Sequence, residues 1–250
     1  MTAVTALVPR LFVAWQDPDS RRFHPVALLD RSGERYRFRY LKQAEGLTGF
    51  EPFVSFPNLH QTFESEQLFP LFENRLMSSR RPDYPRFLED LGLEPGAHPF
   101  DVLSRSGRRF TDSVDLFADP AIEPHTGALT AWFFVRGIRH VQGAEAALEE
   151  LRLGAELRLV PERDNEVSDQ AILLSAANQL SIGWVPDYLV AAIHRLWSGS
   201  GSQSVRVIAE RVNPPTTPLR ARVLCRLQAA APAGFHPFDD PQFMPLVDAE

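Results

Sequence analysis

The sequence predicts an α+β protein of two small domains: an N-terminal mixed sheet with short helices, and a C-terminal small β-barrel with two helices. Three observations support this prediction. The chain has 250 residues, 44% hydrophobic and 23% charged, which is the balance of an ordinary globular protein. Short patterns typical of strands and of helices occur in both halves. A Pro-containing segment with the composition of a linker separates the halves.

These features divide the chain into four parts. We expect an N-terminal domain over residues 1–118, a linker over residues 119–131 and the barrel over residues 132–228. Residues 229–250 form an acidic, Pro-rich tail that we expect to be loosely attached.

The composition of the chain limits where the protein can act and which partners it can bind. The formal net charge is −6, which argues against a non-specific DNA coat, because such proteins are usually basic. No apolar run is long enough to span a bilayer, and residues 1–10 lack the basic-then-apolar pattern of a signal peptide. The single Cys225 excludes an internal disulfide. We expect a cytoplasmic protein with no membrane partner.

The N-terminal half opens with strand patterns. Two apolar runs precede a strictly alternating one: Leu11–Trp15, Val26–Leu29 and Arg35–Tyr40. Because side chains alternate across a strand, the third run places aromatic rings on one face and Arg35, Arg37 and Arg39 on the other. We expect the aromatic face to be buried. For the arginine face two interpretations stay open, namely contact with phosphates or the solvent-facing side of a sheet.

Helical patterns follow in the same half. A helix is predicted over Ser65–Met77, with Ser65 as its N-cap and its regular part starting near Pro70, because proline is tolerated only in a first turn. Two short helices and a strand come next: Pro85–Leu91, Pro99 to about Gly107, and Ser113–Phe117.

The C-terminal half combines short strands with two helices. The strands are expected at Trp132–Val135, Glu156–Val160, Ala171–Leu174, Leu180–Val185, Val205–Val212 and Leu219–Leu227. The helices are expected at Ala144–Leu153 and from Pro186 to Trp197. Five or six short strands with two helices suit a small closed barrel of the OB or SH3-like kind.

Three segments of this half carry a family resemblance, namely Phe133–His140, Asn165–Ile172 and Ile182–Pro186. In this order they resemble the HIRAN domain, whose motifs are an aromatic strand running into Gly-(Ile/Leu)-Arg, then Asn-Pro-x-Asp-x-x-Ala-Ile, then (Ile/Val)-Gly-x-(Val/Leu)-Pro. The resemblance implies a small β-barrel, found alone in bacteria and fused to DNA-remodelling ATPases in eukaryotes. It further implies binding of single-stranded DNA and, in eukaryotic members, of its 3′ end.

The first motif segment supplies three candidate DNA-binding residues. Arg139 matches the motif arginine and is the candidate phosphate ligand, with bracing of its own loop as the alternative. Arg136 lies on the same segment and is counted with it. His140 stands where the family has an aromatic side chain that stacks on a base.

The second and third segments supply four more. Asn165 matches the motif asparagine, which organises a turn more often than it touches DNA. Ser168 occupies the position of the family's aspartate, and Asp169 comes one place later. Trp184 is the candidate for base stacking, with a place in the core as the alternative.

The N-terminal half resembles the N-terminal subdomain of HipA-type kinases over roughly residues 11–117. The matching segments are Leu71–Met77, where the family has Phe-Phe-x-Asn-Leu-Leu-Pro, and Pro99–Leu103 leading to Gly107, where it has Pro-Phe-Asp-Leu-Leu and a glycine. The catalytic motifs of a kinase core do not follow. The resemblance therefore implies an antitoxin-like module that docks a protein partner.

These patterns predict a binding protein that is not an enzyme. The sequence has no His-Glu-x-x-His, paired cysteines, Gly-x-Ser-x-Gly or Walker loop, so we expect no metal and no cofactor. A metal-dependent nuclease would need an acidic cluster beside a lysine, and Lys42 is isolated. The predicted function is a non-enzymatic module for single-stranded DNA or DNA 3′ ends, coupled to a domain that docks an unidentified protein. The alternative, favoured by the acidic net charge, is an antitoxin-like protein–protein interaction factor with no direct nucleic-acid binding.

Overall fold

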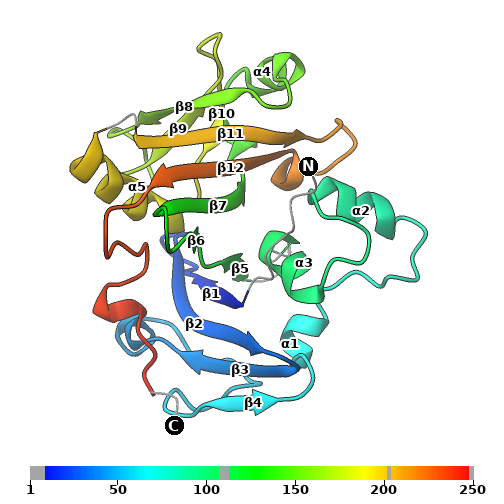
Figure 1. The fold of residues 1–250 in the computed structure, drawn as a ribbon, viewed down its shortest axis with the longest axis vertical. Coiled ribbons are helices and arrows are strands. Elements are labelled where there is room, and N and C mark those ends of the chain that lie inside the picture. Colours follow the sequence, from blue (N-terminus) through cyan, green and yellow to red (C-terminus); the bar gives the residue numbers. More distant parts are fainter. Residues whose placement is uncertain (1–8, 107–112, 202–203, 248–250) are drawn as a thin grey trace. The chain divides into compact units, whose positions relative to one another are not determined.

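The structure is a computed structural model that describes residues 9–106, 113–201 and 204–247. The chain forms two compact units (Figure 1). The first comprises the chain up to Glu89, Leu93–Asp119 and the chain from Asp239, and the second comprises Asp90–Gly92 and Pro120–Phe238. Each unit has its own cluster of buried apolar side chains and is described by itself.

The first unit is built on a five-stranded sheet in the order β4-β3-β2-β1-β5. Its strands are β1 (Arg10–Gln16), β2 (Phe23–Ser32), β3 (Arg35–Tyr40), β4 (Phe63–Ser65) and β5 (Val114–Ala118). The strands predicted in this half are confirmed, but the mixed sheet is wrong, because every pairing between the described strands is antiparallel. Short turns join β1 to β2 and β2 to β3, and connections of that length permit only antiparallel pairing.

Aromatic side chains fill the core against β3. Tyr36, Phe38 and Tyr40 are buried, as the alternation of the sequence predicts. Phe38 stacks on Phe56, with the two ring centroids 3.8 Å apart. The Tyr40 hydroxyl donates to the carbonyl of Phe56 at 2.8 Å and accepts from the amide of Phe53 at 2.7 Å, which ties the loop after β3 to the sheet. Burial raises the pKa of Tyr40 to about 12.

The helices of the N-terminal half are short: α1 (Pro70–Glu73), α2 (Tyr84–Asp90) and α3 (Pro99–Ser106). The regular part of the helix predicted over Ser65–Met77 starts at Pro70, as expected, but Ser65 is not its N-cap and the helix ends at Glu73. Ser65 ends β4, where it pairs with Tyr36, and its hydroxyl accepts the amide of Gln67 in a local turn. The chain therefore becomes helical only at Pro70. The predicted helix end at Gly107 lies outside the described residues.

The C-terminal tail is not loosely attached, contrary to the prediction. The amide of Leu246 donates to the carbonyl of Tyr40 at 2.8 Å. Leu41 and Pro245 form an isolated antiparallel bridge, and Leu246 packs against the core of the first unit. Backbone pairing beside the end of β3 and burial of an apolar side chain together hold this segment in place.

The second unit is built on a seven-stranded sheet in the order β10-β9-β8-β11-β12-β7-β6, with every pairing antiparallel. Its strands are β6 (Ala121–Ile122), β7 (Ala128–Phe134), β8 (Glu156–Pro161), β9 (Ile172–Ser175), β10 (Ser181–Trp184), β11 (Val205–Val212) and β12 (Val223–Ala230). The strands predicted at Ala171–Leu174 and Leu180–Val185 are confirmed as β9 and β10, which pair with each other as a hairpin.

This sheet does not close into the predicted barrel. Its edges are β10 and β6, and the chain that follows β7 meets β10 through an isolated bridge between Arg136 and Trp184. Strand β7 ends at Phe134, and at Gly137, where φ is +67°, the chain turns into the short 3-10 helix η2 (Ile138–His140). Too little of the chain therefore runs beside β10 to form a ladder that would close the sheet.

Two helices pack with this sheet, α4 (Ala144–Glu150) and α5 (Asp187–Ser200). Helix α4 ends earlier than predicted, because Leu151 adopts an extended conformation. Helix α5 follows Pro186 as expected. The strand predicted from Leu219 begins only at Val223, because Leu219–Ala221 forms the 3-10 helix η4.

Cys225 lies on β12 and is fully buried, between Val223 and Leu227 on the same face. Burial and, to a lesser degree, the charge of Glu210 raise the pKa of the Cys225 thiol well above its usual range. The thiol therefore stays protonated, and the residue contributes to packing rather than to chemistry.

Candidate nucleic-acid interface

The motif segments of the second unit meet around one pair of backbone hydrogen bonds. The amide of Arg136 donates to the carbonyl of Trp184, and the amide of Trp184 donates to the carbonyl of Arg136, both at 2.9 Å. This bridge joins the chain after β7 to the end of β10. Residues of the first and third motif segments are therefore neighbours in space.

Two glycines make this close approach possible. A Cβ on Gly183 would lie 2.4 Å from the carbonyl oxygen of Arg136, and a Cβ on Gly137 would lie 2.5 Å from Cε3 of Trp184. Both glycines also have a positive φ, +145° at Gly183 and +67° at Gly137, which other residues rarely adopt. The absence of a side chain at Gly183 thus leaves room for the backbone of Arg136, and its absence at Gly137 leaves room for the indole ring.

The indole of Trp184 is hydrogen-bonded to a carboxylate. The Nε1–H of Trp184 donates to Oε2 of Glu162 at 2.6 Å, and Nδ2 of Asn165 donates to the same oxygen at 2.7 Å. Hydrogen bonds to an ionised acceptor at such distances are among the strong ones in proteins. They fix the orientation of a half-buried ring that already rests on Gly137.

Asn165 also organises the turn that carries the second motif. Its Oδ1 accepts the amides of Val167 at 2.9 Å and Ser168 at 3.2 Å. The Ser168 hydroxyl accepts the amide of Gln170 at 3.3 Å, so it serves its own turn. Asp169 is exposed and makes no hydrogen bond or ion pair with any residue that the structure describes.

Arg139 and His140 lie on η2, directly after Gly137, and both are exposed. The Nε–H of Arg139 donates to Nε2 of His140 at 2.9 Å. Within the described part of the chain no carboxylate pairs with Arg139, so its charge is not neutralised by an ion pair. The short helix η2 lies beside β10, the strand that ends at Trp184.

The structure thus brings Arg136, Asn165 and Trp184 together and leaves Asp169 exposed on the turn. Sequence reasoning missed Glu162, the residue that connects two of them. Glu162 belongs to a run of charged residues just after β8 and carries no periodic or motif signal. Its amide donates to the carbonyl of Ala171 at 2.8 Å, so only the pairing of β8 with β9 and of β9 with β10 places it beside Trp184.

Among the residues that the structure describes, no group of three or more His, Cys, Asp and Glu side chains is arranged to hold a metal ion. None of the helices described is both long enough and apolar enough to cross a membrane.

Comparison with known proteins gives a family match within the second unit. The sequence model of the HIRAN domain matches residues 130–230. A crystal structure of a protein from Lactobacillus plantarum is 20% identical, covers 41% of this chain and 97% of that chain, and has a TM-score of 0.33. The crystal structure of the HIRAN domain of human HLTF is 14% identical, covers 40% of this chain and 74% of that chain, and has a TM-score of 0.30.

The search of the curated proteins found no match. The resemblance of the N-terminal half to HipA-type kinases has no support in the matches, and it stays a prediction. The resemblance of the C-terminal half is confirmed by the family match: residues 130–230 of this chain form a HIRAN domain.

Proposed function

We propose that the HIRAN domain of this chain binds single-stranded DNA or DNA ends. The observation that carries the proposal is the family match over residues 130–230, since the resemblance to this family implies such a ligand. The geometry supports it, because an oriented aromatic ring, an arginine without an ion pair and a polar turn lie on connected elements.

Trp184 is the base-stacking platform in this proposal. A ring that stacks on a base needs an accessible face and a defined orientation. Trp184 is half-buried, so part of its surface remains accessible, and the hydrogen bond to Glu162 limits its rotation. Gly137 supports the ring from the protein side. His140, exposed on η2, is assigned a second, weaker stacking contact.

Arg139 is the phosphate ligand. Its Nε is used by His140, and its two terminal nitrogens have no partner among the described residues. A guanidinium with two free terminal nitrogens can donate to two oxygens of one phosphate. Arg136 precedes it on the same segment and is assigned a supporting phosphate contact.

Asp169 is the group that we assign to a terminal hydroxyl. Ser168, at the position of the family's aspartate, is engaged in its own turn. Asp169 is the exposed carboxylate next to it, and an ionised carboxylate is a strong acceptor for a hydroxyl. Recognition of a 3′ end would therefore depend on Asp169.

The remaining parts of the proposal concern the whole chain. We infer that it acts in the cytoplasm by binding, without catalysis, and that its first unit docks a protein partner. The absence of catalytic sequence motifs and the resemblance of the N-terminal half to HipA-type subdomains support this inference.

The deciding experiment is fluorescence anisotropy of labelled oligonucleotides with the full chain at low and moderate salt. The probes are single strands with a free or a blocked 3′ end, with blunt duplex as the control. Binding to single strands that weakens with salt supports the proposal, because contacts to phosphates release counterions. A preference for the free 3′ end supports the assignment of Asp169. Absence of binding at low salt would overturn the DNA proposal in favour of the protein-only alternative.

A further inference from the structure

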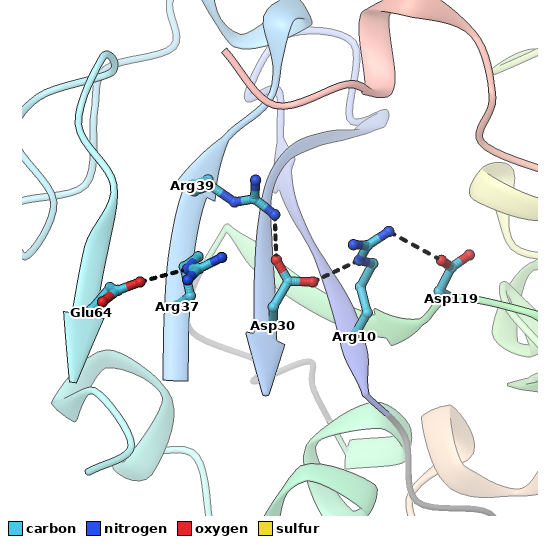
Figure 2. A network of polar contacts seen from close by, with 6 residues as sticks. All are labelled: Arg10, Asp30, Arg37, Arg39, Glu64 and Asp119. Atoms are coloured by element: carbon cyan, nitrogen blue, oxygen red, sulfur yellow. Dashed lines mark hydrogen bonds and ion pairs between the residues drawn. The ribbon is translucent and has the colours of Figure 1, made fainter. Parts of the chain in front are cut away.

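The first unit carries a second charged surface, on the face of its sheet opposite the aromatic core. We call it the arginine hollow and define it by Arg10, Asp30, Arg35, Arg37, Arg39 and Glu64. Its cavity volume is about 300 Å³. Figure 2 shows most of these side chains in one row across β4, β3, β2 and β1.

The strand register explains this row. Arg37 lies opposite Asp30 on β2 and opposite Glu64 on β4, and Asp30 in turn lies opposite Arg10 on β1. Directly opposed residues of antiparallel strands project from the same face of a sheet. The alternation that buries Tyr36 therefore necessarily presents Arg35 and Arg37 on this face.

Ion pairs hold most of the guanidinium groups in place. Oδ1 of Asp30 accepts from Nε of Arg10, and Oδ2 accepts from Nη2 of Arg39, both at 2.7 Å. Nε of Arg37 donates to Oε1 of Glu64 at 2.7 Å. These contacts position the arginines before any ligand arrives, which lowers the entropic cost of binding.

The arginines are nevertheless in excess. Of the described residues, four arginines and two carboxylates line the hollow. Asp119 adds one carboxylate at its edge, 3.9 Å from Nη1 of Arg10 (Figure 2). With Arg35, which lines the hollow as well, four arginines face these three carboxylates. The hollow therefore carries net positive charge, although the whole chain is acidic.

The free donors lie on β3. Arg35 is exposed and has no hydrogen bond or ion pair with the residues that the structure describes. Arg37 uses only its Nε, so both of its terminal nitrogens lack a partner in the described chain, and its side chain is 37% exposed. Planar guanidinium groups with free donors match the oxygen geometry of phosphate.

We propose that the arginine hollow binds a phosphate group. The volume is at the lower end of the range for ligand sites, which suits a phosphate rather than a large molecule. Among the described residues its lining contains one aromatic side chain, Tyr36, and no aliphatic one, and most of the lining side chains are charged. The phosphate belongs to a nucleic-acid strand or to a small phosphorylated molecule, and the experiment distinguishes the two. This site lies outside the HIRAN domain and does not rest on its proposed function.

The test measures the melting temperature of the full chain in rising inorganic phosphate, with chloride at the same ionic strength as reference. The variants are Arg35→Gln alone and Arg35→Gln with Arg37→Gln. The matched control is Arg81→Gln, which removes the same charge from an exposed ion pair with Asp83 in the same unit. Phosphate well above its dissociation constant should raise the melting temperature of wild type and control by about 3 °C more than chloride does.

The double variant should lose this rise, and Arg35→Gln should reduce it. The Arg35 side chain is exposed and makes no hydrogen bond or ion pair within the described chain, so the single variant stays informative if the double variant is destabilised. No phosphate-specific rise in wild type, or an equal rise in all variants, would overturn the site.

A second experiment measures the anisotropy of a labelled oligothymidylate of about 12 nucleotides. Affinity that falls about threefold in the double variant identifies a strand phosphate, and unchanged affinity with a lost thermal rise identifies a small phosphorylated molecule.

Discussion

The indole Nε1–H of Trp184 donates to Oε2 of Glu162 at 2.6 Å, which joins the end of β10 to the turn after β8. Asn165 donates to the same carboxylate oxygen at 2.7 Å. A single acidic side chain therefore connects a strand and the turn that carry two different motifs of the HIRAN domain. Its role is to orient Trp184, and this leads to a first prediction.

Replacing Glu162 by Ala should lower both stability and DNA affinity. Two donors lose a charged acceptor, which costs about 1–3 kcal/mol of the free energy of unfolding. The ring of Trp184 also loses its fixed orientation, so affinity for a single strand should fall about tenfold if Trp184 stacks on a base. Urea denaturation and anisotropy measure the two effects. Glu162→Gln, which retains an oxygen acceptor, should lie between Glu162→Ala and wild type. Equal affinities in all three proteins would contradict the orienting role.

A side chain at Gly137 should destabilise the fold in two ways, through contact with the ring of Trp184 and through backbone strain, and the two can be measured separately. An added Cβ would lie 2.5 Å from Trp184 and would also sit at a φ of +67°. Gly143, in the same unit, has a φ of +78° but nothing within 4 Å of an added Cβ. Gly143→Ala should therefore cost about 1 kcal/mol from backbone strain alone, and Gly137→Ala should cost about 3 kcal/mol or more.

Chemical denaturation of the two variants gives both free energies of unfolding. The difference between them isolates the contact with the indole, because the backbone strain is common to both. Gly137→Ala should also weaken binding of a single strand, whereas Gly143→Ala should not. Similar losses of stability in the two variants would show that the ring moves aside without cost.

His98 should make stability depend on pH. Its Nδ1 accepts the amide of Phe100 at 3.1 Å at the start of α3, which a protonated nitrogen cannot do. Burial and then the charge of Arg31 lower the pKa of His98, and the nearby Asp101 and Glu34 oppose this only in part. The folded chain therefore favours the neutral imidazole.

Below the ordinary histidine pKa of about 6.5, the unfolded chain binds a proton at this residue that the folded chain does not bind. The free energy of unfolding should consequently decrease as the pH falls from about 7.5 through that value. His98→Asn keeps a capping acceptor and does not titrate in this range, so its melting temperature should depend less on pH. Thermal melts of both proteins across this interval measure the difference, and parallel curves would refute the role of His98.

Local patterns in the sequence were enough to predict most of the strands, but not the short strands β4 and β6 or how long each helix runs. The alternation in Arg35–Tyr40 depends only on the pleat of a strand, and β3 follows it. The spacing of Leu68, Leu71 and Phe72 indicates a helical face, yet Phe72 reaches the core from a helix of only four residues. Ser65, predicted as the cap of that helix, lies instead in β4, which pairs with β3, and a pairing between distant segments leaves no local signal.

The same distinction applies to the candidate site. The residues around Gly137, Asn165 and Trp184 can be found from short motifs, because a turn or a close approach requires each residue type locally. Glu162 could not be found, since its role exists only once β8, β9 and β10 are in register. Closure of the barrel depends likewise on how far the chain after β7 runs beside β10, which is a property of the assembled sheet.

Arg139→Ala should weaken binding of single-stranded DNA without lowering the melting temperature. Arg139 is exposed, and its one hydrogen bond within the described chain goes to its neighbour His140, so folding loses little. Loss of one phosphate contact should lower affinity about tenfold and reduce the dependence of the binding constant on salt by about one counterion. Arg206→Ala is the matched control, because it removes the same charge from an exposed position in the same unit, where Arg206 pairs with Glu156. Anisotropy at several salt concentrations and a thermal melt measure both properties. Equal affinity and salt dependence in Arg139→Ala and Arg206→Ala would remove Arg139 from the interface, because a general loss of positive charge would then explain the whole effect.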